Sequence, residues 1–142
     1  MKWLLFFVIT VALFAVFTRS FYHQANPDEL KINNRVLKIE IADEEAERIK
    51  GLSDRDALAE NSGLLFIFEK EAYYSIWMKE MNFPIDIAWF DKNKKIIHLE
   101  SNVSPDTYPK TFVSKDPALY VLEVNAGFFT QNNIKVGDQA EF

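Results

Sequence analysis

The apolar residues of this chain fall into short runs separated by polar turns, a pattern typical of β-strands. Residues 36–42 alternate between apolar and charged positions, which predicts a half-buried strand. Residues 64–68 form a continuous apolar run, which predicts a buried strand. In residues 85–90 the odd-numbered side chains would share one face and the even-numbered ones, Asp86 among them, the other. The remaining predicted strands cover residues 73–78, 95–100, 120–124 and a last stretch ending at Phe142.

Two short helices are predicted between these strands. Asp43 can cap the first helix, which would turn Ala46 and Ile49 inward and end at Gly51 in a left-handed conformation. The second helix would open after Asn125 and run to about residue 132.

The order of these elements predicts the fold class. Six or seven short, mostly antiparallel strands with two small helices indicate an α+β fold, a compact β-barrel-like domain. Residues 101–118 contain three prolines and predict a long ordered loop within it. The domain would occupy residues 35–142, preceded by a polar linker at 23–34 and by a hydrophobic N-terminal helix within residues 1–22.

The N-terminal segment is strongly hydrophobic. Residues 3–17 carry no charge and only one polar residue, Thr10. A spanning helix needs about 20 apolar residues, and a signal peptide about 7–15, so the segment fits a membrane anchor or a cleaved signal peptide. We prefer the anchor; a buried core helix is a third interpretation, weakened by the lack of a polar face. Lys2 would keep the N-terminus in the cytoplasm and the domain on the exterior side, periplasmic or extracellular, or secreted after cleavage.

Composition narrows the classes of partner and chemistry. The chain has 16 basic and 21 acidic residues, a net charge of −5 and no basic run, which disfavours a nucleic-acid partner because phosphate neutralisation dominates that binding. No cysteine is present, which excludes disulfides, thiolate metal sites and a catalytic thiolate. His23 and His98 are isolated, and no P-loop, dinucleotide fingerprint or HExxH motif occurs. We therefore expect no metal and no cofactor.

Charged residues among apolar neighbours provide the candidate site, because such charges are either paired inside the fold or directed at a bound molecule. Trp77, Lys79 and Asp86 lie in one mostly apolar segment broken by a proline. Glu123 interrupts another apolar strand, and Arg55 follows the first helix with a guanidinium suited to a carboxylate or an anionic ligand. One hypothesis is a ligand pocket lined by these five residues. The alternative is that each charge has a structural partner and that the indole belongs to the core.

A second hypothesis pairs the two carboxyl groups of Asp86 and Glu123. If they lay about 5–10 Å apart on neighbouring strands, they could act as general acid and general base in a small hydrolase or lyase. Two separate ion pairs are the alternative. A strongly raised pKa of one of these groups in an open cleft would favour catalysis.

Four segments resemble the motifs of one protein family. Residues 51–55 (GLSDR) resemble GLMxR, and residues 63–68 (GLLFIF) resemble GMLFxF. Residues 77–87 (WMKEMNFPIDI) resemble WMKN-T/M-x-I/F-P-L/I-D-I/V, and residues 120–127 (YVLEVNAG) resemble Y/A-VLE-L/V-x-AG. In this order they resemble domain-of-unknown-function family 192, also called uncharacterised protein family 0127, from about residue 36 to the end. The resemblance implies a small β-rich domain, often exported or membrane-attached in prokaryotes, with no established reaction.

The chain departs from the family pattern at Ser53 and Leu64, where methionine is usual, and at Glu80, where asparagine is usual. The added charge of Glu80 would change the electrostatics of a ligand site. We therefore expect a non-enzymatic accessory domain, at the membrane or exported, that binds a small molecule, an envelope component or a protein partner. The hydrolase or lyase, and a purely structural interaction module without a pocket, are the alternatives.

Overall fold

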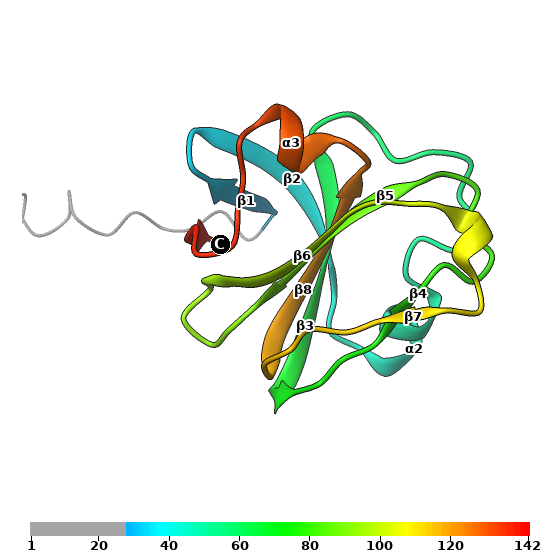
Figure 1. Cartoon of the computed structure of the whole chain (residues 1–142), viewed down its shortest axis with the longest axis horizontal. Coiled ribbons are helices and arrows are strands. Elements are labelled where there is room, and N and C mark those ends of the chain that lie inside the picture. Colours follow the sequence, from blue (N-terminus) through cyan, green and yellow to red (C-terminus); the bar gives the residue numbers. More distant parts are fainter. Residues whose placement is uncertain (1–27) are drawn as a thin grey trace, which may run out of the picture.

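The computed structural model describes residues 28–142 (Figure 1). The strands are β1 (Glu29–Ile32), β2 (Arg35–Ala42), β3 (Ser62–Ala72), β4 (Ile76–Trp77), β5 (Ile85–Phe90), β6 (Ile96–Val103), β7 (Thr111–Phe112), β8 (Ala118–Asn125) and β9 (Ala140–Glu141). The helices are α2 (Glu45–Lys50), the 3-10 helix η1 (Pro105–Thr107) and α3 (Phe128–Gln131). Within the described range, seven strands form one sheet in the spatial order β6-β5-β8-β3-β2-β1-β9, and β4 pairs with β7 separately.

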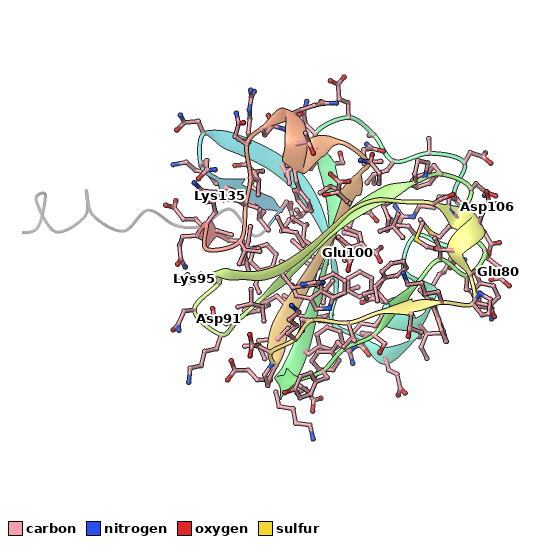
Figure 2. The ribbon with its side chains drawn as sticks, viewed as in Figure 1. Glu80, Asp91, Lys95, Glu100, Asp106 and Lys135 are labelled. Carbon is pink, nitrogen blue, oxygen red and sulfur yellow. The ribbon has the colours of Figure 1, made fainter. Side chains whose placement is uncertain are left out.

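The large sheet is curved into a half-barrel, and its two edges meet at one end. Its neighbouring strands are antiparallel except β2 and β3, which are parallel because the connection through α2 carries the chain back. Backbone hydrogen bonds join the start of β6 to the segment around β9: Ile96 N–H donates to Asp138 O at 2.9 Å, and Ala140 N–H donates to Lys94 O at 2.9 Å. Figure 2 shows Lys95 of the β5–β6 hairpin at this junction.

Both faces of the sheet are covered, which gives the domain two hydrophobic clusters. One cluster includes Phe90 and Phe129 and lies on the side of α3, β1 and β9. The other includes Trp89 and Phe112 and lies on the side of β4 and β7. Figure 1 shows α3 and α2 on opposite sides of the central strands. Strand β5 is buried at every residue because alternate side chains enter the two clusters, as the alternation in residues 85–90 predicted.

The main features of the predicted fold are confirmed: a mostly antiparallel, barrel-like sheet with two small α-helices. The hydrophobic helix predicted within residues 1–22 lies outside the described residues. Among residues 28–142, no helix is both long and apolar enough to cross a membrane. The membrane anchor at the N-terminus therefore stays a prediction.

The sheet begins earlier than the sequence indicated. Strand β1 lies inside the segment expected to be a linker, and its Leu30 and Ile32 are 0% and 1% exposed. It pairs with β2 across a two-residue turn in which Asn33 has a φ of 54°. Asparagine tolerates this left-handed conformation, so the polar pair that suggested a linker is a hairpin turn instead.

Three further local predictions differ from the structure. Helix α2 is capped by Glu44 rather than Asp43, in a capping box with Glu47. Ala46 and Ile49, expected to face inward, are both exposed, Ile49 by 65%, because α2 covers an open cavity rather than a packed core. The strand expected at residues 73–78 is reduced to β4, whose only partner is the equally short β7.

Candidate functional site

Asp86 of β5 is fully buried, and backbone amides hold its carboxylate. Oδ1 accepts hydrogen bonds from Asn102 N–H at 2.8 Å and Gly127 N–H at 3.1 Å, and Oδ2 accepts one from Phe129 N–H at 3.0 Å. Gly127 is the N-cap of α3, and Asn102 belongs to β6. The carboxylate therefore fastens α3 and β6 to the centre of the sheet. These hydrogen bonds agree with a structural role for Asp86, the alternative to a ligand-binding role.

Asp86 and Glu123 lie on neighbouring strands but point to opposite faces of the sheet. In the register of β5 and β8, Asp86 pairs with Val124, whereas Glu123 pairs with Ile87. Directly paired residues share a face, and successive residues alternate between faces. The sheet therefore separates the two carboxyl groups, and the predicted acid–base pair between them is wrong.

Glu123 is buried without a hydrogen-bond partner for one of its oxygens. The residue is 5% exposed, and its Oε2 atom is buried with no hydrogen-bond partner among the described residues. Burial raises the pKa of Glu123 to about 8, against the opposing attraction of the Arg55 guanidinium. The carboxyl group is therefore protonated at neutral pH. Leaving a buried polar group without a hydrogen bond destabilises the fold by about 1–3 kcal/mol. A structural role therefore does not explain the carboxyl group at this position.

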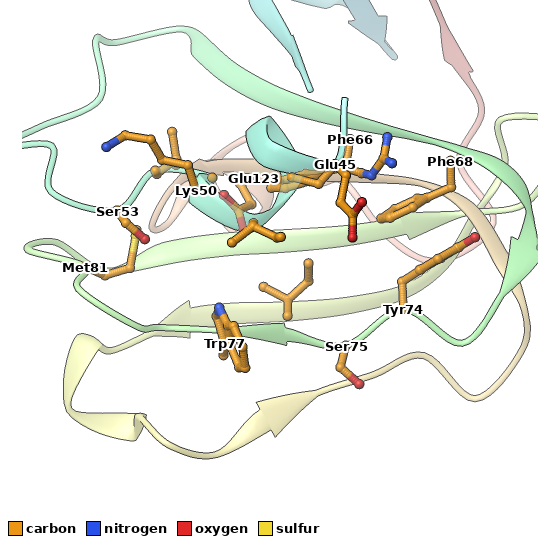
Figure 3. A pocket seen from close by; sticks show the side chains of 15 residues that line it. Glu45, Lys50, Ser53, Phe66, Phe68, Tyr74, Ser75, Trp77, Met81 and Glu123 are labelled. Carbon is orange, nitrogen blue, oxygen red and sulfur yellow. The ribbon is translucent and has the colours of Figure 1, made fainter. Parts of the chain in front are cut away.

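Glu123 lines an open cavity of about 240 Å³ beneath α2, which we call the Glu123 cavity (Figure 3). Its walls are mostly apolar: the rings of Phe66, Phe68, Tyr74 and Trp77, and the aliphatic side chains of Ile49, Leu52, Ile76 and Met81. Figure 3 shows Glu123 on the side of α2 and Trp77 on the facing wall. A concave apolar site with a few inward polar groups is the usual form of a ligand site.

Gly51 lies next to the Glu123 carboxyl group. It ends α2 with a φ of 52°, a left-handed conformation that favours glycine. A Cβ atom at this position would lie 3.5 Å from the ring of Phe66 and 3.9 Å from Glu123 Oε2. A Cβ atom there would therefore pack against the Phe66 ring and the Glu123 carboxyl group.

Hydrogen bonds fix the rim of the cavity. Ser53 Oγ donates to Lys79 O at 2.8 Å, and Asp54 N–H donates to Glu80 O at 2.8 Å. The loop after α2 is thereby tied to the loop after β4. The Lys79 side chain itself points to the surface, where its Nζ lies 4.0 Å from a Glu80 oxygen. Lys79 thus contributes its backbone to the rim, while its ammonium group is outside the cavity lining.

Arg55 is held in an ion pair at the margin of the cavity. Its Nη1 and Nη2 donate to the two carboxylate oxygens of Glu40 at 2.7 and 2.9 Å. This hydrogen-bonded pair lowers the pKa of Glu40 and raises that of Arg55. The guanidinium is absent from the cavity lining, and it acts on Glu123 through its charge.

The structure therefore distributes the five candidate residues unequally. Trp77, which is 48% exposed, and Glu123 both line the cavity. The side chains of Arg55, Lys79 and Asp86 do not. Residues 28–142 contain no group of three histidine or acidic side chains placed to hold a metal ion.

The sequence patterns did not reveal the aromatic wall formed by β3. They assigned Phe66 and Phe68 only to a buried strand. Leu64 of β3 pairs with Glu123, so residues two and four positions further along β3 point to the same face as Glu123. The alternation of side chains along β3 is visible in the sequence. It places Phe66 and Phe68 on the face of Glu123 only once β3 is known to pair with β8. Tyr74 was missed as well, and its ring stacks on Phe68 with a centroid separation of 3.4 Å.

Comparison with protein families supports the resemblance seen in the motifs. Residues 28–142 match DUF192, the family described as Uncharacterized ACR. This chain belongs to the DUF192 family. The match starts just before β1, in agreement with a sheet that begins inside the expected linker. No curated protein matches the chain.

Two crystal structures resemble this DUF192 protein closely in fold. A protein of unknown function from Novosphingobium aromaticivorans DSM 12444 superposes with a TM-score of 0.76 at 26% identity, covering 80% of this chain and 84% of that one. A protein from Sinorhizobium meliloti 1021, described as a proposed transcription regulator, superposes with a TM-score of 0.76 at 27% identity, covering 80% and 91%. The fold is therefore shared among these proteins, and none of these matches establishes an activity for the chain.

All four DUF192 motif segments of this chain meet at the Glu123 cavity. Residues 51–53 come from the first motif and Phe66 from the second, whereas Trp77 and Met81 come from the third, and Glu123 comes from the fourth. These segments are far apart in sequence, and the pairing of β3 with β8 and the rim hydrogen bonds bring them together. The cavity is therefore the candidate functional site of the domain.

Proposed function

We propose that this DUF192 domain is a non-enzymatic binding module that holds a small molecule in the Glu123 cavity. The observation that carries the proposal is the open, aromatic-walled cavity lined by Glu123, a buried acid whose Oε2 has no partner within residues 28–142. A ligand there would bury its apolar surface against the rings and place a polar group against the part of Glu123 that lines the cavity.

Glu123 has a raised pKa in an open cavity, the feature expected to favour catalysis, but the rest of the arrangement favours binding over hydrolysis or elimination. Such reactions by carboxyl groups need a second group that activates water or accepts a proton. Asp86, the expected second carboxylate, faces the other side of the sheet and is saturated by backbone amides. The remaining acidic side chain in the lining, Glu45, belongs to the exposed helix α2 at the rim. Glu123 is therefore proposed as an anchoring group for a ligand.

Removal of the Trp77 indole is expected to weaken ligand binding about tenfold or more, because an aromatic contact and its buried area together contribute about 1.5–3 kcal/mol. The measurement is a thermal-shift screen of the purified chain with small uncharged, cationic and anionic compounds, followed by titration of each hit against Trp77→Ala. Tyr73→Ala is the matched control, because Tyr73 is 61% exposed and lies outside the cavity lining. Hits that stabilise wild type and Trp77→Ala equally would contradict the proposed site.

We also propose that the domain acts on the exterior side of a membrane, held there by the hydrophobic segment at residues 3–17. The sequence alone supports this location, through the length of the apolar run and the positive charge before it. Intact-mass measurement of the protein recovered from the membrane fraction is expected to show an uncleaved N-terminus. A mature chain that starts near Phe21 in the soluble exported fraction would show a cleaved signal peptide instead, and would contradict the anchor.

A further inference from the structure

We propose that the Glu123 cavity takes one aliphatic chain, the apolar part of a single-chain amphiphile whose polar head stays at the mouth. This inference rests on the binding role proposed above and names the apolar part of the ligand; the polar group that meets Glu123 belongs to the head. It depends on the hydrogen bonds of the polar side chains in the lining, on the arrangement of the rings, and on the volume and rim of the cavity.

The partly buried polar side chains of the lining are already hydrogen-bonded to backbone carbonyl groups. Ser53 Oγ and the Tyr74 hydroxyl each donate to a backbone carbonyl, at 2.8 and 2.7 Å. Arg48 Nη1 donates to two others, one of them Ile67 O at 3.1 Å. A ligand that used these donors would first have to break the existing bonds, so it would gain little from them. The part of the ligand inside the cavity is therefore expected to be hydrocarbon.

The polar groups that stay free lie where the cavity opens to water. Glu123 Oε2 is enclosed by the protein, so a ligand in the cavity does not contact it. The other polar residues of the lining, Glu45, Lys50 and Ser75, are exposed. They can meet a head group at the mouth. Because Glu45 and Lys50 carry opposite charges in contact with water, they are expected to discriminate only weakly between charged heads.

Two of the aromatic rings in the walls already cover each other. Phe68 and Tyr74 stack with their centroids 3.4 Å apart and their planes 9° apart. The Arg48 guanidinium also lies over the Phe68 ring, 5.4 Å from its centroid. These contacts occupy ring faces that would otherwise stack on a planar ligand. A flexible chain needs no free ring face, and it can pack against the aliphatic walls at Leu52 and Ile76 as well as against ring edges.

The volume and the rim of the cavity fit one chain. About 240 Å³ corresponds to roughly eight groups the size of a water molecule, at about 30 Å³ each, and a methylene group is of similar size. The cavity would thus hold a chain of roughly eight carbons. Ile49 and Trp77 line the cavity and are exposed, so the mouth has apolar surface that an entering chain would cover.

Carboxylates with chains of about four to about twelve carbons test the inference. The full chain, in lipid nanodiscs and with carbon-13 in its methionine methyl groups, is titrated by NMR. The signal of Met81, which lines the cavity, reports binding at the site rather than partition into the lipid. The affinity is expected to rise about fourfold for each added methylene up to about eight carbons and then to level off, because further carbons stay outside the cavity.

The head group and one wall are then varied. Octanoate, 1-octanol and octylammonium are expected to differ in affinity by less than about tenfold, against about 250-fold between carboxylates of four and eight carbons. Trp77→Ala is expected to weaken all three octyl compounds and to leave their order unchanged. Tyr73→Ala, outside the lining, is the matched control and is expected to bind them as wild type does.

A spin label near the chain end of the nanodisc lipids identifies the source of the chain. Broadening of the Met81 signal before any amphiphile is added would show that a bilayer lipid enters the cavity. A sharp signal that soluble amphiphiles then shift would show that the cavity takes a free amphiphile. Either result supports an aliphatic chain in the cavity.

An affinity that is independent of chain length, or that follows the charge of the head, would overturn the chain inference. The same holds if no alkyl compound or lipid affects the Met81 signal while hits from the thermal-shift screen bind wild type and lose affinity in Trp77→Ala. In that case the class of ligand is wrong and the binding role stands. Hits that bind wild type and Trp77→Ala equally would contradict the binding role itself.

Discussion

Replacement of Asp86 by asparagine is expected to lower the free energy of unfolding by about 3–5 kcal/mol. The carboxylate accepts three backbone hydrogen bonds at a position that is 0% exposed. An asparagine side chain replaces one acceptor oxygen with an NH₂ group, which would face either Phe129 N–H or the N–H groups of Asn102 and Gly127. Buried donors would then oppose each other where acceptor and donor now match. Urea denaturation of residues 28–142, which contain both hydrophobic clusters, measures the change.

Asp91→Asn is the matched control for this prediction. Asp91 Oδ1 accepts hydrogen bonds from Asn93 N–H at 2.8 Å and Lys95 N–H at 3.0 Å, but in a solvent-exposed hairpin turn. Because water can replace those bonds, the expected loss is about 1 kcal/mol or less. If Asp86→Asn proved no more destabilising than Asp91→Asn, the three buried hydrogen bonds would not be what holds α3 and β6 to the sheet.

The contrast between Asp86 and Glu123 shows what a sequence can say about a buried acid. Both interrupt apolar strands, and the sequence singles out both for this reason. Their roles depend on what each face of the sheet meets. Asp86 meets the N-terminus of α3, whose unpaired N–H groups satisfy it, whereas Glu123 meets a cavity. Neither neighbour is close in sequence, so local patterning identifies the unusual residues and leaves their roles open.

The same limit applies to the strands. Those marked by their own residues could be predicted, and those that depend on distant pairing could not. Strand β5 could be predicted along its whole length because the segment is apolar on both faces and ends at a polar turn. Strand β1 could not, because it has only two apolar residues and becomes a strand through pairing with β2 and β9. The aromatic wall of the cavity was missed for a related reason. Phe66 looks like any core residue until the register of β3 and β8 places it beside Glu123.

The Glu123 carboxyl group is expected to make the stability of the domain fall as the pH rises. Its pKa is about 8 in the folded protein and about 4.5 in an exposed, unfolded chain, so between these values the folded state binds more protons than the unfolded state. Each pH unit in this window then removes up to about 1.4 kcal/mol, and the full loss above pH 8 is up to about 5 kcal/mol. Glu123→Gln is expected to remove this dependence and to be more stable than wild type at about pH 9. Urea denaturation across the pH range gives the free energy of unfolding at each point.

Glu40→Gln is the control, because Glu40 is the other carboxyl group near Arg55 and its titration has the opposite sign. The hydrogen bond from Arg55 lowers the pKa of Glu40 below 4.5, so the stability it contributes is present above that pH and is lost only as the pH falls further. The two groups therefore act in separate windows, and Glu40→Gln should leave the slope between about pH 5 and pH 8 intact. Equal slopes for wild type and Glu123→Gln in that window would contradict a protonated, buried Glu123.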